Sequence, residues 1–348
     1  MPAATAAEAP PSLPSLSRPK APFVEGPKLK KPARPSQDLP LHLIEEARRT
    51  KRVSFNPKEH LAFEPPQHIT MMRDIGLEGH GISPNAVSDP FPLFTKEAML
   101  QMRAELFSEW SLENCRFGSD LTPQLIRGLS PENAPFCFSL WWSPEVLKIV
   151  SDIAGIELIP CCDYDVANVI ISINDQNVAT VGSGDETASV GWHYDSVPFV
   201  SVTMASDCTG MVGGETAIRL PDGEVRKVRG PSMGTAVIMQ GRYLEHQALK
   251  AFGGRERIAM VTSFRPKSPL ALDETTLNGL RAISNTSELY TQYNNYRMEI
   301  VEERFRSKIK EERDRVKGRR AFDLQEMRRW LEEQRDFIDH TLEQLIEV

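Results

Sequence analysis

The sequence has little cysteine and no long hydrophobic run, and these absences exclude several classes of protein. Its five cysteines form neither an even set nor a CxxC pair, so we expect no disulfide framework and a reducing, cytoplasmic location. No apolar run approaches the roughly 18 residues of a membrane helix. The 41 basic residues are outnumbered by 48 acidic ones, which predicts no surface for nucleic acid. The first residues include Glu8 and lack the basic and apolar regions of a secretory signal, so no leader is expected.

Composition divides the chain into four expected segments. Ten of the 26 prolines fall within residues 1–40, which also lack clustered apolar side chains. Such a segment cannot bury enough surface to offset the entropy lost on ordering. The predicted segments are a disordered Pro-rich tail over 1–40, a helical and irregular lead-in over 41–159, a β core over 160–266 and C-terminal helices over 267–348.

The lead-in is expected to pack on the core. A short helix is predicted from Leu41 to about Arg52. Two further helices are predicted to begin after Thr95 and after Ser143, whose side chains can accept hydrogen bonds from the free N–H groups of a first helical turn. Prolines punctuate residues 53–92, which predicts irregular structure there.

The core segment has the pattern of β structure. Short β-branched runs are separated by glycines and turn residues, with no helix between them. This arrangement predicts an antiparallel sandwich or barrel with helical flanks, an α+β fold, rather than a doubly wound sheet. The expected strands are Val166–Ile173, Phe199–Met204, Thr216–Leu220, Glu224–Val228, Thr235–Met239 and Arg257–Phe264.

Two long helices are predicted after the core, over 286–317 and 321–348, with Gly318 between them. The second carries an apolar row that recurs every seven residues: Leu324, Leu331, Ile338 and Leu345. This heptad row indicates either a helix that covers one side of its own core or a contact within a homodimer.

The stretch GWHYD, from Gly191 to Asp195, is the most informative in the sequence. Residues two apart in a strand share a face, so His193 and Asp195 are expected to project together into the core. The other histidine of the core segment is His246, 53 residues later. Two histidines and one carboxylate leave about three metal positions open, as in non-haem Fe(II) oxygenases, whereas zinc would more often use a third histidine or a cysteine. His193, Asp195 and His246 are therefore the predicted metal ligands and catalytic centre.

Arg257 lies eleven residues beyond His246, at the start of the strand pattern RIAMVTSF. A guanidinium inside a barrel is costly unless an anion meets it, and its planar fork matches a carboxylate. A dicarboxylate cosubstrate that reaches from the metal to Arg257 would fit. Arg255, two residues earlier on the same face, is the alternative, although Gly253 and Gly254 place it near a turn.

This order of residues resembles the Fe(II)- and 2-oxoglutarate-dependent dioxygenases. An HxD triplet, a distal histidine and an arginine about ten residues further on agree with that superfamily. The turn Gly213-Gly214-Glu215-Thr216 is similar to the GGET turn of its prolyl-hydroxylase-like branch. The Pro-rich start and the layout most resemble uncharacterised fungal members. The resemblance implies a double-stranded β-helix (jelly roll), with the C5 carboxylate of 2-oxoglutarate on Arg257 and Fe(II) on the three predicted ligands.

The resemblance also implies roles for two residues near the start of the core. Tyr164 and Asn168 are expected to share one face of a strand and to bond the carboxylates of the cosubstrate; alternatively, Asn168 satisfies a strand edge. Ala259 departs from the family, because many members have serine or threonine there to help bind the same carboxylate. Cys161 and Cys162 are expected to be core thiols, since adjacent side chains on a strand face opposite ways.

By the same resemblance, the chain oxidises a C–H bond of a small organic molecule with 2-oxoglutarate and O₂, most often by hydroxylation, and releases succinate and CO₂. One alternative is a prolyl-type hydroxylase with a peptidyl substrate, and another is a non-catalytic jelly-roll binding protein. A zinc hydrolase on the same triad would leave Arg257 without a purpose. No nucleic-acid or membrane partner is expected.

Overall fold

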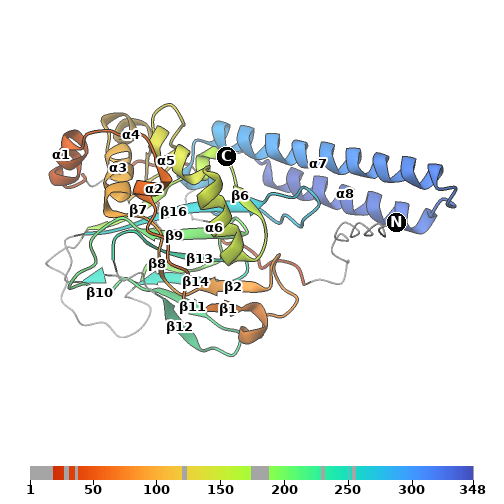
Figure 1. Ribbon diagram of the computed structural model, residues 1–348, viewed down its shortest axis with the longest axis horizontal. Helices are drawn as coiled ribbons and strands as arrows, with labels where there is room; N and C mark the ends of the chain where they lie inside the picture. Colours follow the sequence, from red (N-terminus) through yellow and green to blue (C-terminus); the bar gives the residue numbers. More distant parts are fainter. Residues whose placement is uncertain are drawn as a thin grey trace, which may run out of the picture.

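Figure 1 shows the computed structural model of the chain. It describes residues 19–26, 31–35, 38–119, 124–173, 188–228, 232–249, 251–252 and 256–347. Arg255 and residues 1–18 of the expected tail lie outside these ranges. Within the described part, the predicted α+β class is confirmed, because antiparallel sheets form the centre and helices flank them.

The larger sheet is antiparallel and runs in the order β1-β2-β13-β9-β16-β7-β5-β4, with β3 paired to β13 and β6 paired to β16. Its strands are β1 (Ile69–Met71), β2 (Asn85–Ser88), β3 (Phe91–Pro92), β4 (Arg116–Phe117), β5 (Leu125–Ile126), β6 (Leu158–Pro160), β7 (Asn168–Ile173), β9 (Phe199–Met204), β13 (Thr235–Met239) and β16 (Glu256–Pro266). The expectation that residues 53–92 are irregular is wrong, since β1, β2 and β3 join this sheet. These strands have two to four residues, too few to show an alternating pattern.

The smaller sheet has four strands in the order β12-β11-β14-β8. They are β8 (Ala188–His193), β11 (Thr216–Arg219), β12 (Val225–Val228) and β14 (Glu245–Leu249). A separate pair joins β10 (Val212–Gly213) to β15 (Ala251–Phe252). The two main sheets face one another, because a single cavity is lined by residues of both.

Helices from the lead-in pack on the larger sheet through an apolar core. At the centre of that core, the buried ring of Trp141 contacts Phe94 and Phe264 edge to face, at 5.3 Å and 5.9 Å between ring centroids. Two predicted helix starts are confirmed, since Thr95 and Ser143 cap α3 and α6 through their side chains. The helices are α1 (Leu41–Arg49), α2 (Pro57–His60), α3 (Lys96–Leu106), α4 (Glu109–Asn114), α5 (Pro135–Trp141) and α6 (Pro144–Ala154), with short 3-10 turns η1 (Met72–Ile75), η2 (Asp163–Asp165) and η4 (Arg281–Ile283).

Two long antiparallel helices, α7 (Thr286–Lys317) and α8 (Leu324–Gln344), form a hairpin that extends away from the sheets (Figure 1). Three of the four heptad residues do not contact the rest of the chain closely, because Leu324, Leu331 and Ile338 are 59%, 48% and 41% exposed. Leu345 is partly buried and packs against the core. The buried face of α8 instead carries Trp330 and Phe337. Among the described residues, every helix is either too short or too polar to span a lipid bilayer.

Candidate metal centre

The structure brings His193, Asp195 and His246 together at one end of the smaller sheet. His193 is the last residue of β8 and lies directly opposite His246 on β14. Asp195 Oδ1 lies 3.5 Å from His193 Nε2 and 3.6 Å from His246 Nε2. Ligands about 2.1 Å from one metal ion lie roughly 3–3.5 Å apart, so these two distances fit ligands of one ion.

Asp195 reaches this point by a route that differs from the expected one. The strand ends at His193, and the backbone N–H of Asp195 donates to the carbonyl oxygen of Gly241 at 2.9 Å. The side chains of His193 and Asp195 project together into the cavity, as expected, but Asp195 lies beyond the end of the strand. The segment that follows β8 carries the carboxylate, and the hydrogen bond from Asp195 to Gly241 holds it against the loop before β14.

Backbone carbonyls orient both imidazole rings. Nδ1 of His193 bonds to the carbonyl oxygen of Gly191 at 2.8 Å, and Nδ1 of His246 bonds to that of Leu244 at 2.9 Å. A carbonyl oxygen only accepts, so Nδ1 must carry the proton in each ring. Each Nε2 therefore offers its lone pair toward Asp195. Fixing the other ring nitrogen in this way is how proteins orient histidine ligands of metals.

The second carboxylate oxygen of Asp195 also fits a cation site. Oδ2 is buried and has no hydrogen-bond partner among the described residues. A Cβ atom at position 241 would lie 1.7 Å from it, so only glycine leaves room for the carboxylate there. A buried carboxylate oxygen without a donor is costly unless a cation meets it. The donor set of two imidazole nitrogens and one carboxylate fits a divalent transition metal.

The charges of the three groups are coupled. Burial lowers the pKa of His246 to about 4, and Asp195 only partly offsets this effect. Burial alone would lower the pKa of His193 and raise that of Asp195. The contact with Asp195 outweighs burial at His193, so the pKa of His193 is raised. His246, and then His193, outweigh burial at Asp195, so the pKa of Asp195 is lowered. At neutral pH, His246 is neutral and Asp195 is ionised, which are the states that bind a metal.

A cavity of about 190 Å³ lies between the sheets and contains the triad at its wall. Arg257, on β16, lines the same cavity and is 4% exposed. Its Nε donates to the carbonyl oxygen of Gly214 at 3.1 Å. Burial lowers the pKa of Arg257, while Cys208 and Glu215 act in the opposite direction. Ala259 lines the cavity two residues further along β16.

Asn168 and Tyr164 do not share a face. Asn168 is the first residue of β7 and lines the cavity. Tyr164 lies in η2, and its hydroxyl oxygen accepts from the backbone N–H of Asn285 at 2.7 Å. Tyr164 is not among the residues that line the cavity. The expected strand face is wrong because residues 163–165 form a 3-10 turn.

Arg127 is a cavity residue that the sequence analysis missed. It follows β5, lines the cavity and forms a buried ion pair with Asp165, with 2.7 Å between Nη1 and Oδ1. A two-residue strand in a segment without strand periodicity carries it there. No pattern in the sequence marks this position.

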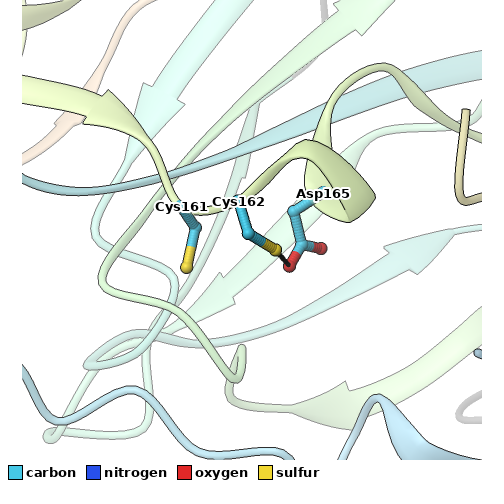
Figure 2. Close-up of side chains that lie close together, drawn as sticks. All are labelled: Cys161, Cys162 and Asp165. Carbon is cyan, nitrogen blue, oxygen red and sulfur yellow. Dashed lines mark hydrogen bonds between the residues drawn. The ribbon is translucent and has the colours of Figure 1, made fainter. Parts of the chain in front are cut away.

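Cys161, Cys162 and Asp165 lie close together (Figure 2), and Asp165 also lines the cavity. The two thiol sulphurs and one carboxylate oxygen lie within 4.8 Å of one another. The expectation that the thiols face opposite ways is wrong, because β6 ends at Pro160 and both cysteines follow it. A hydrogen bond with Cys161, together with burial, raises the pKa of Cys162 far above its ordinary range. Cys162 therefore stays protonated and donates to Asp165 Oδ2 at 3.5 Å.

No protein-family model and no curated protein matches the sequence. The chain is similar to several solved structures at low identity. AviO1 from Streptomyces viridochromogenes is 17% identical, with 53% of this chain and 90% of that chain covered and a TM-score of 0.36. HygX from Streptomyces hygroscopicus, with nickel and 2-oxoglutarate bound, is 13% identical, with 52% and 83% covered and a TM-score of 0.35. A 2OG-Fe(II) oxygenase family protein from Burkholderia pseudomallei is 14% identical, with 40% of this chain covered and a TM-score of 0.31. The match spans 65% of that last chain, less than two thirds of its length.

Proposed function

We propose that the chain is an Fe(II)- and 2-oxoglutarate-dependent dioxygenase on a double-stranded β-helix, which hydroxylates a C–H bond of a small organic molecule and releases succinate and CO₂. The observation that carries this proposal is the placement of the triad and Arg257 in one cavity. The triad offers two lone pairs and a carboxylate at a single point. Arg257 offers a buried cation to an anion that enters the same space.

Each residue has a task in this proposal. His193, Asp195 and His246 hold the metal and leave about three of its positions open. Arg257 binds the far carboxylate of 2-oxoglutarate and so fixes the direction in which the cosubstrate enters. Bound Fe(II) and 2-oxoglutarate supply the oxidation of a C–H bond by O₂. The apolar walls exclude water from the site; they include Val190, Val200, Val202, Ala248, Ala259 and Val261.

The size of the cavity favours a small substrate over a peptide. Ligand pockets in proteins commonly have volumes of about 300–1,000 Å³, whereas this cavity has about 190 Å³. The same space must also hold the cosubstrate. A prolyl-type hydroxylase needs a groove for an extended chain, so the peptidyl alternative is the weaker one.

Anaerobic titration tests the proposal. Fe(II) followed by 2-oxoglutarate should produce the charge-transfer absorption of an iron chelate in the wild-type chain and none in His246→Ala. Admission of O₂ should then convert 2-oxoglutarate to succinate. A zinc hydrolase or a binding protein would give neither the absorption nor succinate. If both signals are absent at saturating metal and cosubstrate, the oxygenase is rejected.

A further inference from the structure

Three buried polar residues line the cavity at a distance from Arg257. Arg127, Asp165 and Asn168 are 4%, 2% and 4% exposed, and all three line the cavity. Asp165 Oδ1 accepts from Arg127 Nη1 at 2.7 Å and from Asn168 Nδ2 at 3.2 Å. We call these three residues the Arg127 cluster.

The strand register separates this cluster from Arg257. Arg257 pairs with Ser172 across β16 and β7, whereas Asn168 pairs with Val261. The two positions are therefore four residues apart along the strands, about 13 Å at 3.3 Å per residue. A cosubstrate carboxylate on Arg257 and a group on Asn168 would occupy different ends of the cavity.

Two atoms of the cluster lack partners. Arg127 Nη2 and Asn168 Oδ1 are both buried, and neither has a hydrogen-bond partner among the described residues. The orientation of the Asn168 amide follows from its neighbour, because the carboxylate of Asp165 only accepts and must face the amide nitrogen. Arg127 Nη2 is thus a free hydrogen-bond donor and Asn168 Oδ1 a free acceptor. Because buried polar groups of native proteins normally have partners, a bound ligand would supply the missing ones.

We propose that the Arg127 cluster binds an amide edge of the substrate, as carried by a primary carboxamide or a lactam. The substrate carbonyl accepts from Arg127 Nη2, and its N–H donates to Asn168 Oδ1. A carboxylate is disfavoured, because Asp165 already balances the charge of Arg127 and Asn168 presents an acceptor. This inference rests on the proposed function for the reaction that follows binding, although the cluster includes none of the three proposed iron ligands.

Matched ring compounds test the recognition. 2-Pyrrolidinone carries the amide edge, cyclopentanone has the same ring without the N–H, and butanoate carries a charge. Their binding is measured by ligand-observed NMR with the full chain, loaded with 2-oxoglutarate and with Zn(II) as a diamagnetic substitute for Fe(II). The lactam should bind saturably and at least tenfold more tightly than either control, about 1.4 kcal/mol. Equal binding of cyclopentanone, or no saturation by the lactam, overturns the proposal.

Two variants locate the contact. Arg127→Lys keeps a cation for Asp165 but removes Nη2, and Asn168→Leu removes the acceptor. Each should weaken lactam binding about tenfold or more. Arg265→Lys is the matched control, since Arg265 is only partly buried and does not line the cavity. Unfolding midpoints identify a variant that fails to fold, and the other variant then decides.

The cosubstrate is titrated into the same samples. If Arg127→Lys and Asn168→Leu weaken 2-oxoglutarate instead of the lactam, the cluster serves the cosubstrate and the inference is wrong. A wild-type chain that binds the lactam but neither metal nor 2-oxoglutarate would reject the proposed function and leave the amide site standing. Binding of metal and 2-oxoglutarate without the lactam would reject the amide site alone.

Discussion

At the scale of single residues, Gly241 is what lets Asp195 reach the two histidines. Gly241→Ala should therefore reduce metal affinity by tenfold or more, because a Cβ atom would lie 1.7 Å from Asp195 Oδ2 and displace the carboxylate. Iron content after dialysis measures the effect. Gly191→Ala is the matched control, since no atom lies within 4 Å of a Cβ there, although His193 bonds to the same residue. Equal iron content in both variants would contradict this role.

Arg257 is expected to act on the cosubstrate and not on the metal. Arg257→Ala should raise the apparent KM for 2-oxoglutarate by roughly 30-fold or more, because a buried charge-assisted contact to a carboxylate is worth about 2–5 kcal/mol. Iron content should not change. Arg255→Ala is the comparison that the sequence suggests, because Gly253 and Gly254 predict a turn beside it and an arginine in a solvated turn would contribute about 1 kcal/mol or less to cosubstrate binding. If Arg255→Ala has the larger effect, the assignment of the cosubstrate anchor is wrong.

At the scale of elements, Arg297 joins the helical hairpin to the chain before it. Its guanidinium donates to the carbonyl oxygens of Asp273 and Phe337, at 3.0 Å and 3.1 Å, and its charge lies 3.7 Å from the Asp273 carboxylate. Arg297→Met should lower the free energy of unfolding by about 3–5 kcal/mol, because it leaves a buried carboxylate unpaired. Arg306→Met, which breaks an exposed pair with Glu302 on the same helix, should cost about 0.5 kcal/mol or less.

The same pair predicts how stability depends on pH. Burial would raise the pKa of Asp273, but Arg297 and hydrogen bonds from Thr275 outweigh burial and lower it below its ordinary value of 3.8. Because the pKa of Asp273 is lower in the folded chain than in the unfolded chain, the ionised carboxylate stabilises the fold at pH values above the pKa of the unfolded chain. This stabilisation is lost as the pH falls through the pKa of the folded chain. Denaturant unfolding between pH 5 and pH 2 should therefore show a smaller acid loss in Arg297→Met than in the wild type. An equal loss of unfolding free energy with falling pH in the two chains would contradict the coupling of Asp273 to Arg297.

Sequence patterns predicted many of the longer elements, although strand β14 and helix α5 were not among them. α7, β9 and β13 begin and end at the expected residues. The strands β1 to β5 were not predicted because they have two to four residues each and are held by their neighbours in the sheet. The heptad row of α8 was found, but the face that packs is centred on Trp330 and Phe337, since larger side chains fill the space against α7.

The candidate site divides in the same way. The spacings of histidine, aspartate and arginine predict the site residues His193, Asp195, His246 and Arg257. Ionisable groups within a β core usually have a binding or catalytic role. Arg127 could not be predicted, since its partner Asp165 lies 38 residues later and only the fold brings them together.

At the scale of the whole molecule, part of the expected disordered tail packs on the cavity. Val24 is 3% exposed and lines the cavity, and Arg242 donates to the carbonyl oxygen of Pro22. The expectation of disorder over residues 1–40 is therefore wrong for residues 19–26. Removal of residues 1–26 should weaken cosubstrate binding and lower the unfolding midpoint, because it uncovers the cavity. Removal of residues 1–18 alone is the control and should change neither; equal behaviour of the two truncated chains would contradict the packing.

The pairing of His193 with His246 has a consequence for folding. The two ligands lie on neighbouring strands of the smaller sheet, 53 residues apart in the chain. A cation held between them is a cross-link that exists only in the folded state. Free metal at 100 times its dissociation constant should then stabilise the chain by about 2.7 kcal/mol. The melting temperature should rise with added Fe(II) or Zn(II) in the wild type and in His68→Ala, whose histidine is exposed, and stay constant in His246→Ala. Heat alone, with no knowledge of the substrate, thus reports whether the centre is filled.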